Sequence, residues 1–307
     1  MQQIIKSAHL ATDVEKAIQS IHYDKLFILT DENTHTHCLP LLTEIPLLHD
    51  AKEIVIPAGD SNKTIENLSR VWQLLTENGA TRHSLLANLG GGMVTDLGGF
   101  AAATFKRGIT YINISTTLLG AVDAAVGGKT AINFGGYKNE IGSFYPSKSV
   151  IISSDFFRTL DHTALLSGYA EMIKHALIHS EAEWEKIMAY SFDEIDYTKL
   201  NELVFRSIKI KQDVVEKDPF EKNIRKALNF GHTTAHAFES FAMSSGRPVP
   251  HGYAVAWGMI VELWLSYRLC DFPKDKLQRS VRFIRDHYGA FPITCDYYEA
   301  LYEIARH

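Results

Sequence analysis

Two histidines four residues apart, His232 and His236, have the spacing of metal ligands. We expect a helix over residues 229–236, and residues four apart on a helix project from the same face. Imidazole nitrogens on a shared face can bind zinc together. The pattern is weak in a chain with 14 histidines, and two structural histidines remain the more common outcome. A third histidine, His251, follows Pro250 at the expected start of a further helix.

A charged pair lies within the otherwise apolar segment 168–175. Glu171 and Lys174 are one helical turn apart, and a carboxylate in apolar surroundings is unfavourable unless it is paired or bound to a cation. An ion pair on a solvated helix face is the alternative. The apolar neighbours on both sides of Glu171 favour a functional pair.

Three contiguous glycines at 90–92 follow the apolar run 85–89 and precede a segment rich in Ala and Gly. A strand that leads into a glycine turn and then a helix is typical of phosphate binding. Without Cβ atoms the backbone can approach a pyrophosphate, and the helix start offers N–H groups and a positive dipole end. The glycines depart from the usual G-x-G-x-x-G spacing, so a simple tight turn remains an alternative.

The stretch 115–139 combines small residues and hydroxyls with one acid and two lysines. This composition suits a pocket for a hydroxylated, anionic ligand, in which a lysine binds phosphate or carboxylate as a point charge. A flexible polar loop is the alternative. The density of Gly-Gly-Lys at 127–129 and Lys-Asn at 138–139 favours the pocket.

The elements that must position these groups differ between the two halves of the chain. Strand patterns at 25–30, 53–56, 84–89, 110–114 and 149–152 alternate with helical patterns, which predicts a Rossmann-like parallel sheet with ligands at the carboxyl ends of its strands. After about residue 160 only helices are expected, at 165–178, 181–190, 199–215, 227–241, 253–269 and 275–287. We therefore predict an α/β domain over residues 1–160 and an all-α domain over residues 161–307, with a cleft between them as a common place for an active site.

Composition narrows the class of protein. The 307 residues are 46% hydrophobic and carry a net charge of −5, which argues against a general nucleic-acid or anionic-membrane surface. No apolar run approaches the roughly 18 residues of a membrane span, and the first residues lack a signal-peptide pattern. The cysteines Cys38, Cys270 and Cys295 have no paired spacing and are expected to be reduced thiols. These features favour a cytoplasmic protein.

Taken together, the motifs follow one another in a recognisable order from about residue 30 to residue 260. They are Gly90-Gly91-Gly92, Asp96-Leu97-Gly98-Gly99, Thr116-Thr117-Leu118-Leu119, Val126-Gly127-Gly128-Lys129-Thr130, Lys138-Asn139, Ala170-Glu171-Met172-Ile173-Lys174, Leu228-Asn229-Phe230-Gly231-His232-Thr233 and His251-Gly252. In this set and order the chain resembles the 3-dehydroquinate synthases of the sugar-phosphate cyclase superfamily. Each motif alone is weak, but jointly they are highly specific.

The resemblance implies an NAD-binding α/β domain and a helical domain that binds a divalent metal, zinc or cobalt, with one active site between them. The family is a carbon–oxygen lyase of the shikimate pathway, the route to the aromatic amino acids. It converts 3-deoxy-D-arabino-heptulosonate 7-phosphate into 3-dehydroquinate and phosphate. The steps are transient oxidation by NAD, elimination of phosphate, re-reduction, ring opening and intramolecular aldol closure. Oxidation to a ketone acidifies the neighbouring C–H, and zinc would polarise the developing ketone.

Residue roles also follow from the resemblance. The implied metal ligands are Glu171, His232 and His251, which moves His236 from the metal to the substrate. The implied substrate contacts are Lys129, Asn139, Lys174, Lys211, Arg225, Asn229 and His236. Arg107 corresponds to an arginine that reaches the substrate phosphate from a partner subunit, which implies a homodimer. The implied NAD contacts are Asp31, Asp60, Lys63, Gly91, Gly92, Asp96, Thr116, Thr117, Asp123, Lys138 and Thr159.

One departure and three alternatives accompany this assignment. Family members usually continue into a segment with adjacent lysines, whereas this sequence stops at residues 305–307, so we expect a truncated C-terminus. A related sugar-phosphate cyclase would differ mainly in its substrate. A metal-dependent polyol dehydrogenase, such as glycerol dehydrogenase, would release NADH. A non-enzymatic protein that binds NAD and metal would not need the substrate set of Lys129, Lys174, Asn229 and His236.

Overall fold

The computed structural model describes residues 2–135, 137–294, 297 and 301, and the chain forms two compact units. The first, here called the sheet unit, comprises Met1–Leu160 and Tyr197–Ile208. The second, the helical unit, comprises Asp161–Asp196 and Lys209–His307. Helix α9 (Tyr197–Lys217) contributes residues to both units. The expected truncation concerns residues 305–307, which lie outside the described residues.

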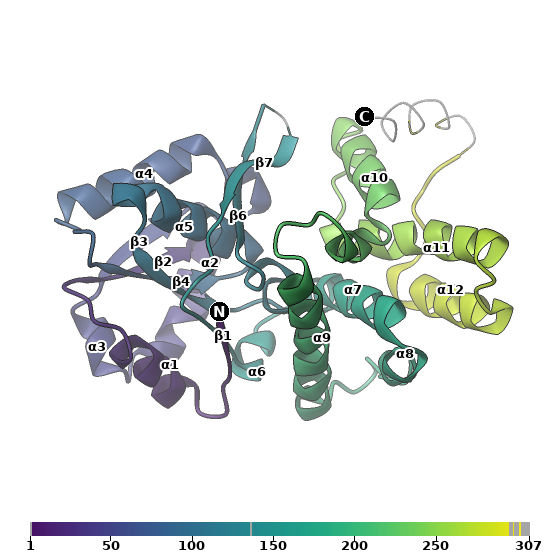
Figure 1. Ribbon diagram of the computed structural model, residues 1–307, viewed down its shortest axis with the longest axis horizontal. Coiled ribbons are helices and arrows are strands. Elements are labelled where there is room, and N and C mark those ends of the chain that lie inside the picture. The colour runs from purple at the N-terminus through teal and green to yellow at the C-terminus, as the bar shows by residue number, and fades with distance from the viewer. Residues whose placement is uncertain (1, 136, 295–296, 298–300, 302–307) are drawn as a thin grey trace. The chain divides into compact units, whose positions relative to one another are not determined.

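The sheet unit contains a six-stranded sheet in the order β1-β8-β5-β4-β2-β3, and every neighbouring pair is parallel (Figure 1). The chain leaves β2 toward β3 but leaves β4 toward β5, so its direction across the sheet reverses between β2 and β4. Ligands of open parallel sheets bind outside the carboxyl ends of the strands at such a switch point. The strands are β1 (Gln3–Lys6), β2 (Leu26–Asp31), β3 (Lys52–Ile56), β4 (Leu85–Gly90), β5 (Thr110–Ser115) and β8 (Ser149–Ile152).

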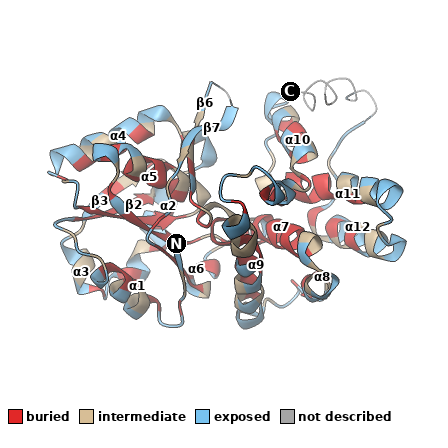
Figure 2. Ribbon diagram, in the orientation of Figure 1, coloured by how far each residue is buried: buried red, intermediate tan, exposed pale blue. Residues whose placement is uncertain are grey.

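Helices cover both faces of this sheet. Alternate strand residues point to opposite faces, so Phe27 and Leu29 join one buried core while Leu26 and Ile28 join the other. The helices α4 (Ile65–Glu77) and α5 (Gly92–Thr104) complete the first core, and α1 (Leu10–Gln19) contributes to the second. Figure 2 shows the buried residues concentrated in the sheet between these helices. The short helices of the unit are α2 (Glu32–His37), α3 (Pro46–His49) and α6 (Ser154–Phe157).

The five predicted strands and the Rossmann-like class are confirmed. The strands could be predicted because buried parallel strands have continuous apolar sequences. The sequence missed β1 and an antiparallel hairpin, β6 (Lys129–Phe134) and β7 (Tyr137–Phe144), within the region expected to be a polar pocket or loop. Almost all of β7 is exposed, so it lacks the apolar run by which the other strands were found. Short helical turns are η1 (Leu39–Leu42), η2 (Asp60–Asn62), η3 (Phe105–Arg107) and η4 (Gly120–Ala124).

After β8 the described residues form no further strand, as expected. One predicted helix is wrong: residues 227–241 form not one helix but two elements, because Gly231 adopts a left-handed conformation with φ of 84°. His232 is consequently the first residue of a helix rather than part of its middle. The elements of the helical unit besides the end of α9 are α7 (His162–His179), α8 (Glu181–Met188), η5 (Ile224–Asn229), α10 (His232–Ser244), α11 (His251–Leu269) and α12 (Lys274–Tyr288).

The structure also bears on the expectations about membrane spans and cysteines. None of the helices among the described residues has both the length and the apolar character needed to cross a membrane. Cys38 and Cys270 are free thiols, and Cys295 lies outside the part of the chain that the structure describes.

Candidate cofactor and metal sites

The glycine turn joins the end of β4 to the start of α5. No side chain caps the N-terminus of α5, so the first N–H groups of a 13-residue helix remain available to an anion. The glycines are needed for space: a Cβ on Gly91 would lie 2.8 Å from Thr117 Cγ2, and one on Gly92 would lie 3.1 Å from Ala124 Cβ. This backbone-lined turn at the switch point therefore fits a pyrophosphate.

A cluster of charges surrounds the buried ammonium of Lys63 in the sheet unit. Its Nζ lies 3.1 Å from an Asp96 oxygen and 3.4 Å from an Asp60 oxygen, and it donates to the side-chain oxygen of Asn139. Lys138 pairs with the other Asp60 oxygen at 3.4 Å. The structure thus brings together five of the residues assigned from the resemblance, four to the cofactor and Asn139 to the substrate.

The two acids of this cluster differ in their electrostatics. Burial would raise the pKa of Asp60, but the charges of Lys63 and Lys138 outweigh it and lower the pKa. Burial raises the pKa of Asp96 to about 6, although the Lys63 ammonium opposes this shift. Asp96 is therefore an acid that changes its charge near neutral pH.

Hydroxyl groups line the carboxyl ends of the neighbouring strands. Thr116 is buried, and Thr117 Oγ1 accepts a hydrogen bond of 3.0 Å from the Gly120 N–H. The buried thiol of Cys38 interacts with the side chains of Thr116 and Thr159, and burial raises the pKa of this thiol to about 11. No motif in the sequence singles out Cys38, since its contacts come from segments far away in the chain.

The remaining assigned residues of the sheet unit lie at the ends of its elements. Asp31 ends β2, and its side chain caps α2 by accepting from the Thr34 N–H at 2.7 Å. Asp123 lies in η4, and Lys129 is the exposed first residue of β6. Arg107 is exposed and has a φ of 66° at the end of η3.

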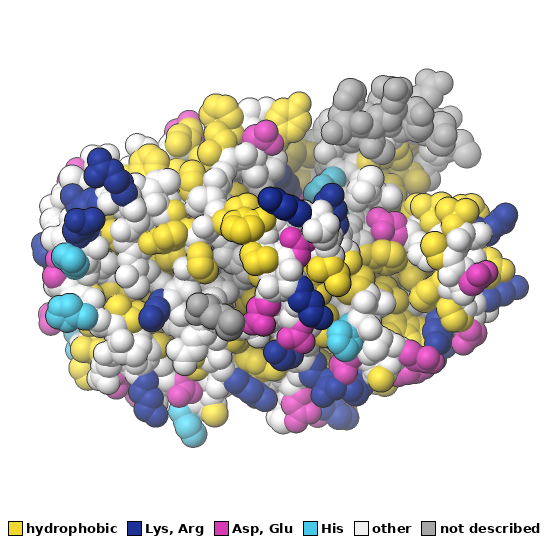
Figure 3. Space-filling model, in the orientation of Figure 1, with side chains coloured by type: hydrophobic (Ala, Val, Ile, Leu, Met, Phe, Trp, Pro, Cys, Tyr) yellow, Lys and Arg dark blue, Asp and Glu magenta, His cyan; other side chains and the backbone are white. Residues whose placement is uncertain are grey.

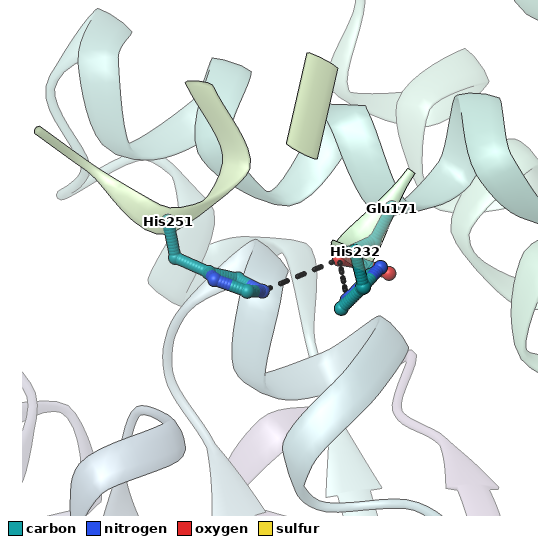
Figure 4. A group of neighbouring side chains, drawn as sticks. All are labelled: Glu171, His232 and His251. Atoms are coloured by element: carbon teal, nitrogen blue, oxygen red, sulfur yellow. Dashed lines mark ion pairs between the residues drawn. The ribbon is translucent and has the colours of Figure 1, made fainter. Parts of the chain in front are cut away.

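In the helical unit, three side chains from three helices converge as a metal site would require. Glu171 of α7, His232 of α10 and His251 of α11 each offer one ligand atom, and these atoms all lie within 4.8 Å of one another. Both histidine Nε2 atoms are 3.5 Å from Glu171 Oε1, and Figure 4 shows the two rings directed at this carboxylate. Two imidazoles and a carboxylate are a typical ligand set for a catalytic zinc ion.

The carboxylate of Glu171 is the strongest sign that this cluster binds a cation. It is fully buried, its Oε2 is ion-paired with the Lys174 ammonium, and its Oε1 is 3.5 Å from the Nε2 atoms of His232 and His251. Burial alone would raise its pKa, but the adjacent Lys174 ammonium and the two histidines lower the pKa well below its usual range. Burial alone would lower the pKa of His251, but hydrogen bonds and charges from Glu171 and Glu239 outweigh it and raise this pKa to about 10. Glu171 is therefore held as an anion that a divalent ion would suit.

His236 is outside the ligand cluster. Its ring centroid lies 5.6 Å from that of His232 and 6.4 Å from that of His251. The pairing suggested by four-residue spacing is therefore not the one that the cluster contains. The described residues instead place Glu171 with His232 and His251, as the resemblance implies.

The other assigned residues of the helical unit are buried cations and two exposed polar side chains. Lys174, Lys211 and Arg225 are 1%, 5% and 3% exposed, and Arg225 Nη1 donates to the Pro219 carbonyl at 2.7 Å. His236 is exposed on α10. Asn229 is also exposed, and its amide donates to Glu221 Oε1 at 2.8 Å.

Glycines bring the three ligand-bearing helices close together. A Cβ on Gly252 would overlap the backbone of Ser167 in α7, and the Gly252 N–H donates to Ser167 Oγ at 3.0 Å. A Cβ on Gly258 would overlap the carbonyl of Gly231, which precedes His232. Close contact at these points fixes the starts of α10 and α11, where His232 and His251 lie.

Comparison with known proteins agrees with this geometry. Two family models match: 3-dehydroquinate synthase N-terminal over residues 53–167 and 3-dehydroquinate synthase C-terminal over residues 168–307. A protein of Parabacteroides distasonis named 3-dehydroquinate synthase is 52% identical over 306 residues, covering all of this chain and 87% of the relative.

Solved structures have the same fold. A 2-deoxy-scyllo-inosose synthase complexed with carbaglucose-6-phosphate, NAD⁺ and Co²⁺ matches with a TM-score of 0.86 and 23% identity, over 99% of this chain and 83% of that one. ValA, a 2-epi-5-epi-valiolone synthase from Streptomyces hygroscopicus with NAD⁺ and Zn²⁺ bound, has a TM-score of 0.81 and 25% identity, over 100% and 87% of the two chains. With both family models matched and a relative that is 52% identical over the whole of this chain, the chain belongs to the 3-dehydroquinate synthase family.

Proposed function

We propose that the protein converts 3-deoxy-D-arabino-heptulosonate 7-phosphate into 3-dehydroquinate and phosphate. The observation that carries the proposal is the convergence of Glu171, His232 and His251 in a chain that is 52% identical to a named synthase. The chain also retains the charged and polar side chains that a substrate with both a phosphate and a carboxylate requires.

The sheet unit is proposed to hold NAD. The N-terminus of α5 at Gly91 and Gly92 would bind the pyrophosphate. Two sets of side chains would bind the remainder of the cofactor. The first is the charged cluster of Asp60, Lys63, Asp96 and Lys138, and the second comprises Asp31, Asp123 and the hydroxyls of Thr116, Thr117 and Thr159. In the helical unit, Glu171, His232 and His251 would bind zinc or cobalt. When bound, NAD supplies a reversible hydride acceptor, and the metal supplies a Lewis acid for a substrate oxygen.

The substrate groups are proposed to bind as follows. The buried cations Lys174, Lys211 and Arg225 provide positive charge for phosphate or carboxylate, and their burial strengthens each interaction by excluding water. Asn229 and His236 orient the hydroxyls from exposed positions near the ligand helices. In the sheet unit, Lys129 and Asn139 bind the substrate, and Lys129 stabilises the charge on the departing phosphate.

The protein is further proposed to act as a cytoplasmic homodimer in which Arg107 reaches the partner's substrate. Two features of the sheet unit support a second copy. Arg107 is exposed, and the β6–β7 hairpin has exposed apolar side chains: Phe134, Tyr137 and Phe144 are 52%, 70% and 51% exposed. Figure 3 shows hydrophobic side chains over this hairpin. Exposed strands with apolar side chains often pair with another chain.

A product analysis tests the proposed substrate. The protein is incubated with the heptulosonate phosphate, NAD and zinc or cobalt, and the organic product is separated and identified. We expect 3-dehydroquinate and inorganic phosphate in equal amounts. Absence of 3-dehydroquinate, together with turnover of a different sugar phosphate such as the substrate of a related cyclase, would reject the assignment. Sedimentation of the same preparation tests the homodimer, and a monomer at the assay concentration would contradict that part.

A further inference from the structure

A second carboxylate, that of Glu239, contacts His251 on the side of its ring that faces away from Glu171. Glu239 lies on α10, seven residues after His232, and is only 8% exposed. Its Oε2 is 3.2 Å from His251 Nδ1, while His251 Nε2 on the opposite side of the ring is 3.5 Å from Glu171 Oε1. The imidazole of His251 therefore lies between two carboxylates.

His232 has the corresponding arrangement. Its Nδ1 is 3.3 Å from the backbone carbonyl of Phe230, and its Nε2 is 3.5 Å from the same Glu171 oxygen. An oxygen that only accepts hydrogen bonds requires a proton on the nitrogen that faces it. A metal ion on Nε2 would need the lone pair of that nitrogen, so the one proton of a metal-bound imidazole would lie on Nδ1, and both Nε2 atoms point to the Glu171 carboxylate. The two histidines thus present the same nitrogen to the same point.

From this geometry we infer that Glu239 is a positioning residue, which holds the Nδ1–H of His251 and thereby presents Nε2 to the metal. The inference rests on the proposed metal site. A carboxylate is a stronger acceptor than the carbonyl that serves His232, so it also makes His251 the more electron-rich of the two imidazoles. It also adds a second carboxylate to the cluster, in which Glu171 is already paired with the Lys174 ammonium.

Glu239 and His232 lie on the same helix, α10. His232 and Glu239 are seven residues apart, about two helical turns, and so lie on one face of the helix. One rigid element therefore carries both a ligand and the group that orients the ligand of α11. The sequence contains this signal as a glutamate on the face of His232, but its partner His251 comes from another helix.

Metal affinity of a Glu239→Gln variant tests the inference. The metal-free parent and variant are titrated with Zn²⁺ or Co²⁺ against a chelator of known affinity. We expect the variant to bind 10- to 100-fold more weakly, because the amide can donate toward Nδ1 and no longer fixes the tautomer. The absorption bands of bound Co²⁺ should also shift, which a loss of general stability would not cause. Glu185→Gln, an exposed glutamate that pairs with Arg279, is the matched control and should match the parent.

The inference and the metal site can fail separately. If the parent itself binds neither ion, the proposed metal site is wrong. If the parent binds and Glu239→Gln has the same affinity and Co²⁺ spectrum, the role of Glu239 is wrong. In a His251→Ala background, Glu239→Gln should have little further effect, and an undiminished effect there would also overturn the inference. Should Glu239→Gln not fold, Glu239→Asp takes its place, and unchanged affinity would again count against the role.

Discussion

At the scale of single residues, Glu171 shows why spacing along one helix does not identify the cluster that could bind a metal. The four-residue spacing of His232 and His236 describes neighbours on one helix, but ligands from separate helices leave no local pattern in sequence. The carboxylate instead lies among apolar neighbours on α7 and meets histidines from the first residues of α10 and α11. Only motif order along the whole chain could assign this set, and the structure supplies its physical basis.

Removal of one ligand should release the metal. We expect His232→Ala to lose bound zinc or cobalt during dialysis, because two ligands remain where three converge. Metal content after dialysis measures this, and His236→Ala is the matched control from the same helix face, since its ring lies outside the ligand cluster. A metal content in His232→Ala equal to that of the parent would disprove the ligand assignment.

Lys129 should affect chemistry without affecting either cofactor. The Lys129→Ala variant is expected to bind NAD and metal as the parent does, because its side chain is exposed at the start of β6. Phosphate release should fall by about 100-fold or more, as for other losses of transition-state charge stabilisation. NAD titration, metal analysis and a phosphate assay on one preparation measure these effects. Unchanged turnover would refute the role.

Asp96 should make stability depend on pH. Its folded pKa of about 6 lies above the ordinary 3.8, so between these values the folded protein keeps a proton that the unfolded chain has released. The stabilisation is full below pH 3.8 and is lost as the pH rises through 6. Asp96→Asn lacks this proton, so its free energy of unfolding relative to the parent should increase across this window by about 3 kcal/mol. Urea unfolding at several pH values measures it, and a pH-independent difference would contradict the shifted pKa.

At the scale of elements, the sequence predicts buried structure best. The strands β2, β4 and β5 are nearly continuous apolar runs because helices cover both faces of the sheet. The exposed hairpin of β6 and β7 has no such run, and its polar composition predicts a pocket or loop instead. The sequence also does not predict the break before α10, because nothing around Gly231 distinguishes it from a glycine within a helix. Its left-handed conformation is known only from the structure.

Helix contact in the helical unit can be tested through Gly252. A Cβ there would overlap the backbone of Ser167, so Gly252→Ala must separate α7 from α11 or displace the start of α11. We expect a loss of stability of about 1–3 kcal/mol and weaker metal binding, because His251 is the adjacent residue. Thermal unfolding and metal titration measure the two effects. Thr233→Ala, an exposed position of α10, should change neither, and a Gly252→Ala variant that behaves in the same way would show that the contact is unimportant.

At the scale of the whole molecule, the fold does not decide the reaction. Structures with TM-scores above 0.8 include synthases named for different products, so the product depends on side chains rather than on the sheet and helices. The central claim is that NAD in this protein is a temporary hydride acceptor within a lyase. A polyol dehydrogenase with the same two cofactors would leave the hydride on NAD.

The most direct test follows phosphate and NADH together during complete conversion of the heptulosonate phosphate. The reaction contains NAD in molar excess over the protein, with zinc or cobalt present. We predict one phosphate for each substrate consumed, while the NADH absorbance stays no higher than the protein concentration allows. NADH that accumulates in proportion to the substrate consumed, or substrate oxidation without phosphate release, would contradict the account.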